Sequence, residues 1–170
     1  MVNKLLISIV AVLFGIMSFG SITANTGEYT PVPVDESTRV AYVDAIYRAD
    51  GDCYIDADFI EWYEGEAANR IFREREADLG MDEAPDGYYI VNDDQAIERL
   101  KLAPDVKVLM QIYDRTDDIA EADVVWNEQI ALDKFISLMT DNGEMNLRDY
   151  PYHLTIEDGV ITKIVQQFIP

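Results

Sequence analysis

The sequence predicts an α+β domain with a mainly antiparallel sheet, or a small, partly open (OB-like) β-barrel, and two helices. Short runs in which apolar and polar residues alternate dominate the chain, as they do in strands with one buried face. Asp50-Gly51 and Asp158-Gly159 each separate two such runs, a pattern typical of β-hairpins. Only residues 64–78 and 134–140 are predicted to be helical.

The first 24 residues are predicted to be a signal peptide that is cleaved on export. Lys4 precedes an uncharged apolar run, residues 5–19, and the small Ala24 suits the position before a cleavage site. The alternative is an uncleaved anchor, but a membrane-spanning helix needs roughly 20 apolar residues. No cysteine follows the run for lipid attachment. We therefore expect a chain that begins at Asn25 and is secreted or resides in the periplasm or cell envelope.

The exported chain is strongly acidic. The whole sequence has 33 acidic and 13 basic residues, a formal net charge of −20, and cleavage removes only one charge, Lys4. This charge argues against nucleic acid or an anionic membrane as a partner. It favours solubility and leaves an unidentified protein or small ligand outside the cytoplasm as the expected partner. A surface adapted to salt, which screens the repulsion, would explain the same composition.

Residues 25–38 are predicted to be a flexible linker, and residues 39–170 a single globular domain. The domain begins with a hairpin of two strands, 39–49 and 53–59. A shift in the apolar pattern after the second strand predicts a β-bulge near Phe59-Ile60. Side chains alternate across a strand, so the second strand has an apolar face of Cys53, Ile55, Ala57 and Phe59 and an acidic face of Asp52, Tyr54, Asp56 and Asp58.

The middle of the chain carries a helix and several strands. The helix over 64–78 has an apolar stripe that includes Phe72, and Gly80 follows its end. Strands are expected at 88–92, 97–102, 106–113 and 124–131, with Ala103-Pro104-Asp105 separating the second from the third. Leu132 and Asp133 are predicted to be the hydrophobic staple and N-cap of the helix over 134–140, and Asn142-Gly143 to end it. The last hairpin joins residues 152–156 to 160–169.

Cys53 and His153 are the only cysteine and histidine. No internal disulfide can form, so the fold depends on packing. No hydrolase signature, zinc-ligand set or phosphate-binding glycine motif occurs. Cys53 shares its strand face with Ile55 and Ala57, which predicts a buried thiol, and His153 is predicted to be a residue of the last hairpin.

The acidic strand face offers candidate calcium ligands: Asp50, Asp52, Asp56 and Asp58. Asp50, Asp52 and Glu61 match the first, third and last ligand positions of an EF-hand loop. Tyr54 and Ile55, however, replace an oxygen ligand and the loop glycine. Two interpretations of these four aspartates therefore remain open. They form a calcium site of another type, or they belong to a solvated acidic face with no cofactor.

A second cluster combines the carboxylates Asp58 and Glu61 with the aromatic residues Trp62 and Tyr63. Two carboxyl groups about 5–9.5 Å apart across a cleft can cleave glycosides, so Asp58 and Glu61 are the candidate catalytic residues. Trp62 and Tyr63 are the candidate ligand-binding residues. The alternative is that their side chains pack at the edge of the core. We favour a non-enzymatic binding or structural module, with a carboxylate-based glycan hydrolase and a calcium-stabilised structural module as the alternatives.

Two segments resemble a group of small exported bacterial proteins that carry D-x-x-E-W-x-x-G-x-x-A followed by Y-Y-I-x-N. Here the first segment runs from Asp58 to Ala68 and the second from Tyr88 to Asn92, and a terminal strand beginning Gly159-Val160 ends in Pro170. The similarity covers most of the exported domain. The family has no assigned activity, so the resemblance implies an intact single domain and supplies no catalytic residue.

Overall fold

The computed structural model describes residues 32, 35–116, 118–141 and 145–169. The predicted signal peptide, most of the linker and the Asn142-Gly143 stop lie outside these residues. No helix in the described part is long and apolar enough to cross a membrane. The strands are β1 (Thr38–Ala49), β2 (Asp52–Glu64), β3 (Tyr88–Val91), β4 (Ile97–Met110), β5 (Glu128–Ile130), β6 (Tyr152–Glu157) and β7 (Val160–Gln166). The helices are α1 (Gly65–Arg75) and α2 (Leu132–Thr140), with short 3-10 helices η1 (Ala77–Leu79), η2 (Ile119–Glu121) and η3 (Leu147–Asp149).

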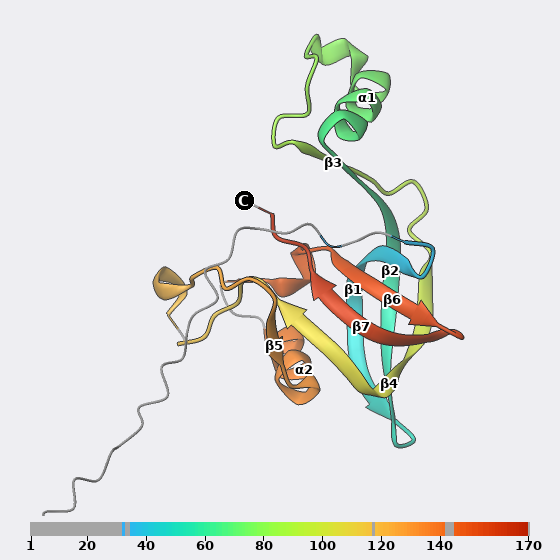
Figure 1. The fold of residues 1–170 in the computed structure, drawn as a ribbon, viewed down its shortest axis with the longest axis vertical. Coiled ribbons are helices and arrows are strands. Elements are labelled where there is room, and N and C mark those ends of the chain that lie inside the picture. The colour runs from blue at the N-terminus through green and yellow to red at the C-terminus, as the bar shows by residue number, and fades with distance from the viewer. Residues whose placement is uncertain (1–31, 33–34, 117, 142–144, 170) are drawn as a thin grey trace, which may run out of the picture.

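Five strands close into a barrel (Figure 1). β1 pairs with β2 and with β6, β2 pairs with β4, and β6 pairs with β7. All four of these pairings are antiparallel. β4 runs parallel to β7, and this pairing completes the ring. The predicted α+β class with a small barrel and two helices is therefore confirmed. The barrel is closed rather than partly open, and one of its pairings is parallel.

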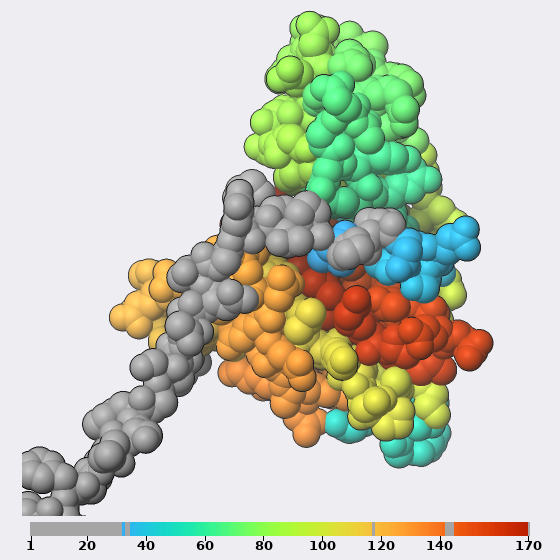
Figure 2. Space-filling model, in the orientation of Figure 1, coloured from blue at the N-terminus to red at the C-terminus, as the bar shows by residue number. Residues whose placement is uncertain are grey.

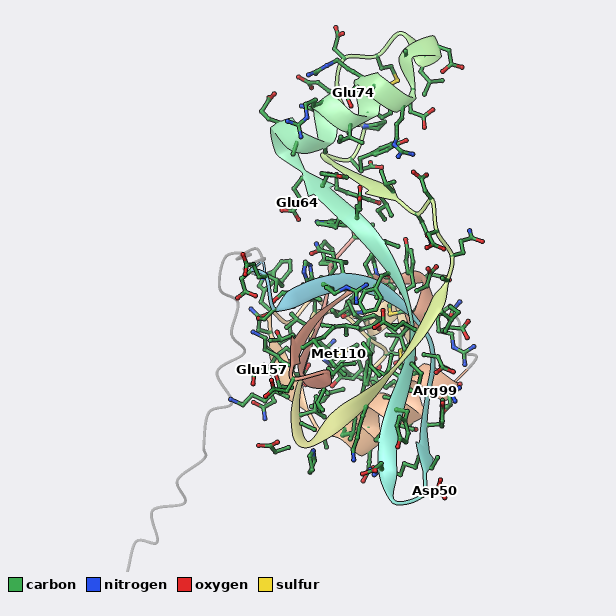
Figure 3. The ribbon with its side chains drawn as sticks, turned by 90° about the vertical axis from the view of Figure 1, so that its right-hand side faces the viewer. Asp50, Glu64, Glu74, Arg99, Met110 and Glu157 are labelled. Carbon is green, nitrogen blue, oxygen red and sulfur yellow. The ribbon has the colours of Figure 1, made fainter. Side chains whose placement is uncertain are left out.

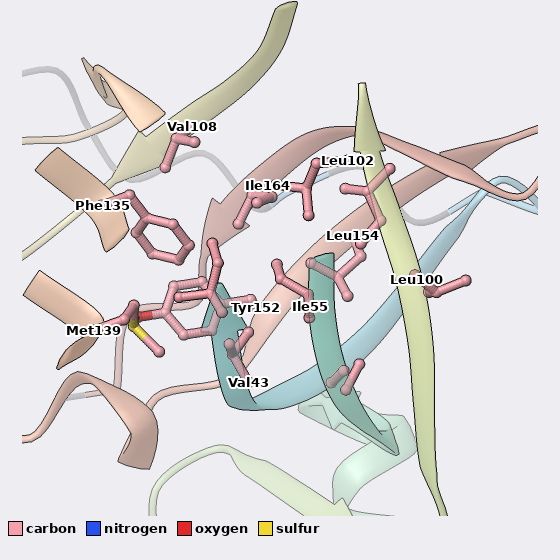
Figure 4. Close-up of a cluster of buried hydrophobic side chains, with 14 of the residues drawn as sticks. Val43, Ile55, Leu100, Leu102, Val108, Phe135, Met139, Tyr152, Leu154 and Ile164 are labelled. Atoms are coloured by element: carbon pink, nitrogen blue, oxygen red, sulfur yellow. The ribbon is translucent and has the colours of Figure 1, made fainter. Parts of the chain in front are cut away.

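The core fills the barrel with the inward faces of its strands and with side chains from α2 (Figure 4). Phe135 and Met139 of α2 reach the fully buried Tyr152, whose ring lies 5.6 Å from that of Phe135 in an edge-to-face arrangement. The Tyr152 hydroxyl donates to the Leu147 carbonyl, 2.9 Å away, so this polar group is satisfied inside the core. Cys53 is buried as predicted, and burial raises the pKa of its thiol.

A lobe projects from one end of the barrel (Figures 1 and 2). It forms because β2 continues past its last pairing with β4 at Asp58 and then pairs with β3 instead. α1 packs on one face of this two-stranded extension, where Ala68, Phe72 and Ala84 make a second small core against Tyr63 and Tyr89. The tip of the β1–β2 hairpin, with Asp50, lies at the opposite end of the molecule (Figure 3).

Two irregularities predicted in the strands, a β-bulge and a strand break, are not found where they were expected. The bulge expected at Phe59-Ile60 is wrong: the register shift lies in β1, between Val43 and Ala45. The change of apolar pattern in β2 instead follows from its change of partner. The expected separation of two strands at Ala103-Pro104-Asp105 is also wrong, because β4 runs through these residues without a break. Its register with β7 shifts between Leu102 and Lys107, and such irregularities tolerate a proline in a strand.

The ends of several helices and strands also differ from those predicted. α2 begins at Leu132, and Ala131 occupies its N-cap without a side-chain hydrogen bond, so the N-cap assignment of Asp133 is wrong. Asp133 lies in the first turn, where its charge suits the helix dipole, and forms an ion pair with Arg48. α1 ends at Arg75, three residues before the predicted end. The strand predicted over 124–131 shrinks to β5, and β7 ends at Gln166.

Candidate functional site

One wall of the candidate site comes from the extension of β2. The register pairs Trp62 with Ile90, Tyr63 with Tyr89 and Glu64 with Tyr88. Tyr63 and Tyr89 pack against α1, so strand alternation turns Trp62 and Tyr88 to the opposite face. There the two rings stack, with centroids 4.6 Å apart and an interplanar angle of 14°.

The opposite wall comes from the segment before β5 and from the segment after β7. Trp126 precedes β5 and meets Phe168 edge to face, with ring centroids 5.4 Å apart. The two walls enclose a cleft of about 450 Å³. We call it the aromatic cleft and define it by Trp62, Tyr88, Trp126 and Phe168, the carboxylates Glu64 and Asp86, and Gly87 and Gln167.

The aromatic cleft is electrostatically negative. Its charged lining residues, Glu64 and Asp86, are both acidic and exposed, and no lysine or arginine among the described residues lines it. Glu64 accepts a hydrogen bond of 2.9 Å from the indole nitrogen of Trp62, which places a carboxylate at the edge of that ring. Burial, followed by the Asp86 charge, raises the pKa of Tyr88, so its phenol stays protonated at neutral pH. The cleft thus combines aromatic rings with acceptors.

A buried histidine lies behind the Gln167 part of the lining. His153 is 2% exposed, and its Nε2 lies 2.8 Å from Oε1 of Gln167. The Gln167 amide nitrogen donates to the Phe168 carbonyl, so its oxygen faces the imidazole and Nε2 of His153 carries the proton. Nδ1 of His153 is buried with no hydrogen-bond partner among the described residues. Burial therefore lowers the pKa of His153, more than the Gln167 hydrogen bond and the Glu64 charge raise it.

We expect the free energy of unfolding to fall as the pH drops below 6.5, the ordinary pKa of histidine. The unfolded chain takes up a proton there while the folded chain does not. The loss is about 1.4 kcal/mol per pH unit and stops once the pH is below the folded pKa. Urea unfolding of wild type and His153→Gln from pH 5 to 7.5 measures it. Because carboxylates titrate in both proteins, a stability difference that is constant across this range would contradict the prediction.

Comparison with protein-family models, with curated proteins and with solved structures gives no match for this chain. The resemblance to small exported bacterial proteins therefore stays a prediction.

The structure does not bring the two candidate catalytic carboxylates together. Asp58 and Glu61 are three positions apart on β2, so their side chains leave opposite faces of the strand. Asp58 accepts a hydrogen bond of 2.7 Å from Asn92 and lines a separate hollow with Tyr42. Glu61 is exposed and accepts from the Tyr63 hydroxyl at 2.6 Å. The two carboxyl groups line different hollows.

The candidate calcium ligands are spread along β2 and its turn. Asp52 forms an ion pair with Lys101 at 2.7 Å, and Asp56 forms a bidentate ion pair with Arg99 at 2.9 and 3.1 Å. The hydrogen bonds from Arg99 lower the pKa of Asp56. Asp50 is exposed at the hairpin tip. Within the described ranges, no group of three or more histidine, cysteine or acidic side chains converges on a point that could hold a metal ion.

The candidate binding pair is divided between two faces. Trp62 lines the aromatic cleft, whereas Tyr63 packs against the small core of the lobe. The sequence pattern alone does not mark Tyr88, Trp126 and Phe168 as ligand-binding residues. They come from three segments that only the tertiary fold joins. The one usable signal was alternation, because Trp62 and Tyr63 had to face opposite ways on one strand.

Proposed function

We propose that this chain is an exported, non-enzymatic binding module whose ligand site is the aromatic cleft. The observation that carries the proposal is the convergence of four aromatic rings from separate segments on one hollow of about 450 Å³. Ligand sites are typically concave, mostly apolar and lined by a few polar groups. The separation of Asp58 and Glu61 favours binding over a carboxylate-based hydrolysis of glycans.

We further propose that the barrel is OB-like. In spatial order, β6, β1, β2 and β4 are the fourth, first, second and third strands of the barrel, which is the order of a Greek key. β7 then closes a five-stranded ring, and OB folds are five-stranded Greek-key barrels. The lobe with α1 and β3 is inserted between the second and third barrel strands, and the face of these two strands takes part in ligand binding in OB folds. This position supports a role for the lobe in completing the site.

Intrinsic fluorescence offers a direct test, because the chain has two tryptophans and both line the aromatic cleft. We expect members of a small-molecule library to change the emission of the exported protein saturably. The affinity of these compounds should fall about tenfold in Trp126→Ala, since one aromatic wall is lost. Tyr47→Ala, a matched aromatic control on β1 away from the cleft, should bind them like wild type.

Two results would overturn the proposal. One is a library without any saturable binder, or with binders that Trp126→Ala leaves unaffected. The other concerns export: mass spectrometry of the protein used in the assay should find Asn25 as the first residue. Intact Met1 on protein that stays inside the cells would remove the exported role.

A further inference from the structure

We propose that the aromatic cleft takes a soluble organic cation with an alkylated ammonium head group. The inference rests on the proposed function, because it names the ligand class of the same site. Three properties of the cleft support it: its aromatic walls, its charge and its balance of hydrogen-bonding groups.

The aromatic walls suit a cation that carries its charge under methyl or methylene groups. Aromatic faces are electron-rich and attract such a cation without needing hydrogen bonds from it. Trp62 and Tyr88 supply one wall as a nearly parallel pair, and Trp126 and Phe168 supply the other. Tryptophan is the strongest cation–π partner, and both tryptophans of the chain are in this lining.

The charge of the lining has the sign that a cation requires. Glu64 and Asp86 stand at the cleft, and the basic residues of the described ranges lie outside its lining. Glu64 accepts from the Trp62 indole nitrogen, and this contact places negative charge beside the ring that would receive the cation. The whole chain adds a long-range field, since its formal net charge of −20 draws cations toward it.

The hydrogen-bonding groups favour an organic cation over a metal ion or a sugar. A hard metal ion needs a shell of oxygen ligands, whereas four of the eight lining residues are aromatic. A sugar needs donors as well as acceptors. Two side-chain donors of the lining are already engaged, because the Trp62 indole nitrogen donates to Glu64 and the Gln167 amide nitrogen donates to the Phe168 carbonyl. The protonated Tyr88 hydroxyl remains as a donor, so the lining offers a sugar fewer donors than acceptors. A cleft of about 450 Å³ has room for choline-sized compounds.

The test compares choline with its neutral carbon isostere, 3,3-dimethylbutan-1-ol, by calorimetry on the exported protein at matched ionic strength. The two compounds have nearly the same shape and differ in charge. We expect choline to bind about tenfold more tightly than the isostere, because only the cation gains from the rings and carboxylates. Glu64→Gln should weaken choline binding about fivefold. Glu157→Gln, which removes an exposed carboxylate at the end of β6, should leave it unchanged.

The outcomes separate this inference from the proposed function. Equal binding of choline and the isostere, or displacement of either compound by a neutral disaccharide, would overturn the cation and leave the cleft as a ligand site. No binding of choline, together with no library compound in the fluorescence screen, would overturn both. Cosedimentation with phosphatidylcholine vesicles would place the head group on a lipid and overturn the assignment to a soluble compound.

Discussion

Phe135→Ala is expected to lower the free energy of unfolding by about 3–5 kcal/mol, the usual cost of removing a buried phenylalanine ring. Phe135 is 0% exposed and is one of the two buried residues, with Met139, through which α2 enters the barrel core. Its removal takes away the edge contact with Tyr152 and leaves a cavity beside a ring that is itself fully buried. The surrounding strands are closed into a ring and have little freedom to collapse into the space.

Chemical denaturation measures this effect as a shift of the urea midpoint at constant slope. The control is Ile97→Ala on β4, since Ile97 is 51% exposed and its truncation opens no cavity. A midpoint shift for Phe135→Ala no larger than that of the control would show that α2 is not packed into the core as described.

Gln166→Leu is expected to cost about 2–5 kcal/mol, although it replaces a polar residue by an apolar one of similar size in the interior. Gln166 is 0% exposed, and its side-chain oxygen accepts from the backbone nitrogens of Gln111 and Ile112 at 2.8 and 2.9 Å. β4 ends at Met110, so these two donors have left the strand ladder. Leucine would leave both without an acceptor, at a cost of about 1–3 kcal/mol each.

Hydrogen exchange distinguishes this mechanism from a packing defect. The amide protons of Gln111 and Ile112 should exchange faster in Gln166→Leu, beyond the change expected from the global loss of stability. Gln129→Leu on β5 is the matched control, because Gln129 is exposed and its replacement should alter neither stability nor exchange. Unchanged local exchange at Gln111 and Ile112 would contradict the proposed role of Gln166.

The local pattern of the sequence predicted the two hairpins, because strand alternation and Asp-Gly turns are short-range signals. It missed the continuity of β4 through Pro104, since a proline next to a register shift is tolerated by the tertiary structure. The parallel pairing of β4 with β7 joins segments about 60 residues apart in the chain. No local pattern encodes such a pairing, and it is this pairing that turns the predicted sheet into a closed barrel.

The sequence likewise predicted only part of the candidate site. Trp62 was identified because it adjoins carboxylates in the sequence, but its partners in the aromatic cleft depend on how the lobe sits over the barrel end. The sequence presents the acidic residues of β2 as candidate ligands because it does not show which basic residues lie beside them in the fold. In the fold, Arg99 and Lys101 of the neighbouring β4 pair with Asp56 and Asp52. Cross-strand neighbours of this kind follow from register, which alternation alone does not fix.

Single-tryptophan proteins test most directly whether Trp62 and Trp126 line one ligand site. Trp62→Phe and Trp126→Phe each keep an aromatic ring in place and leave one indole as the reporter. On titration with choline, we expect both proteins to change emission with half-saturation concentrations that agree within about threefold, since one bound molecule contacts both walls. An indole whose emission does not change on titration, or two half-saturation concentrations that differ by more than tenfold, would contradict a shared cleft.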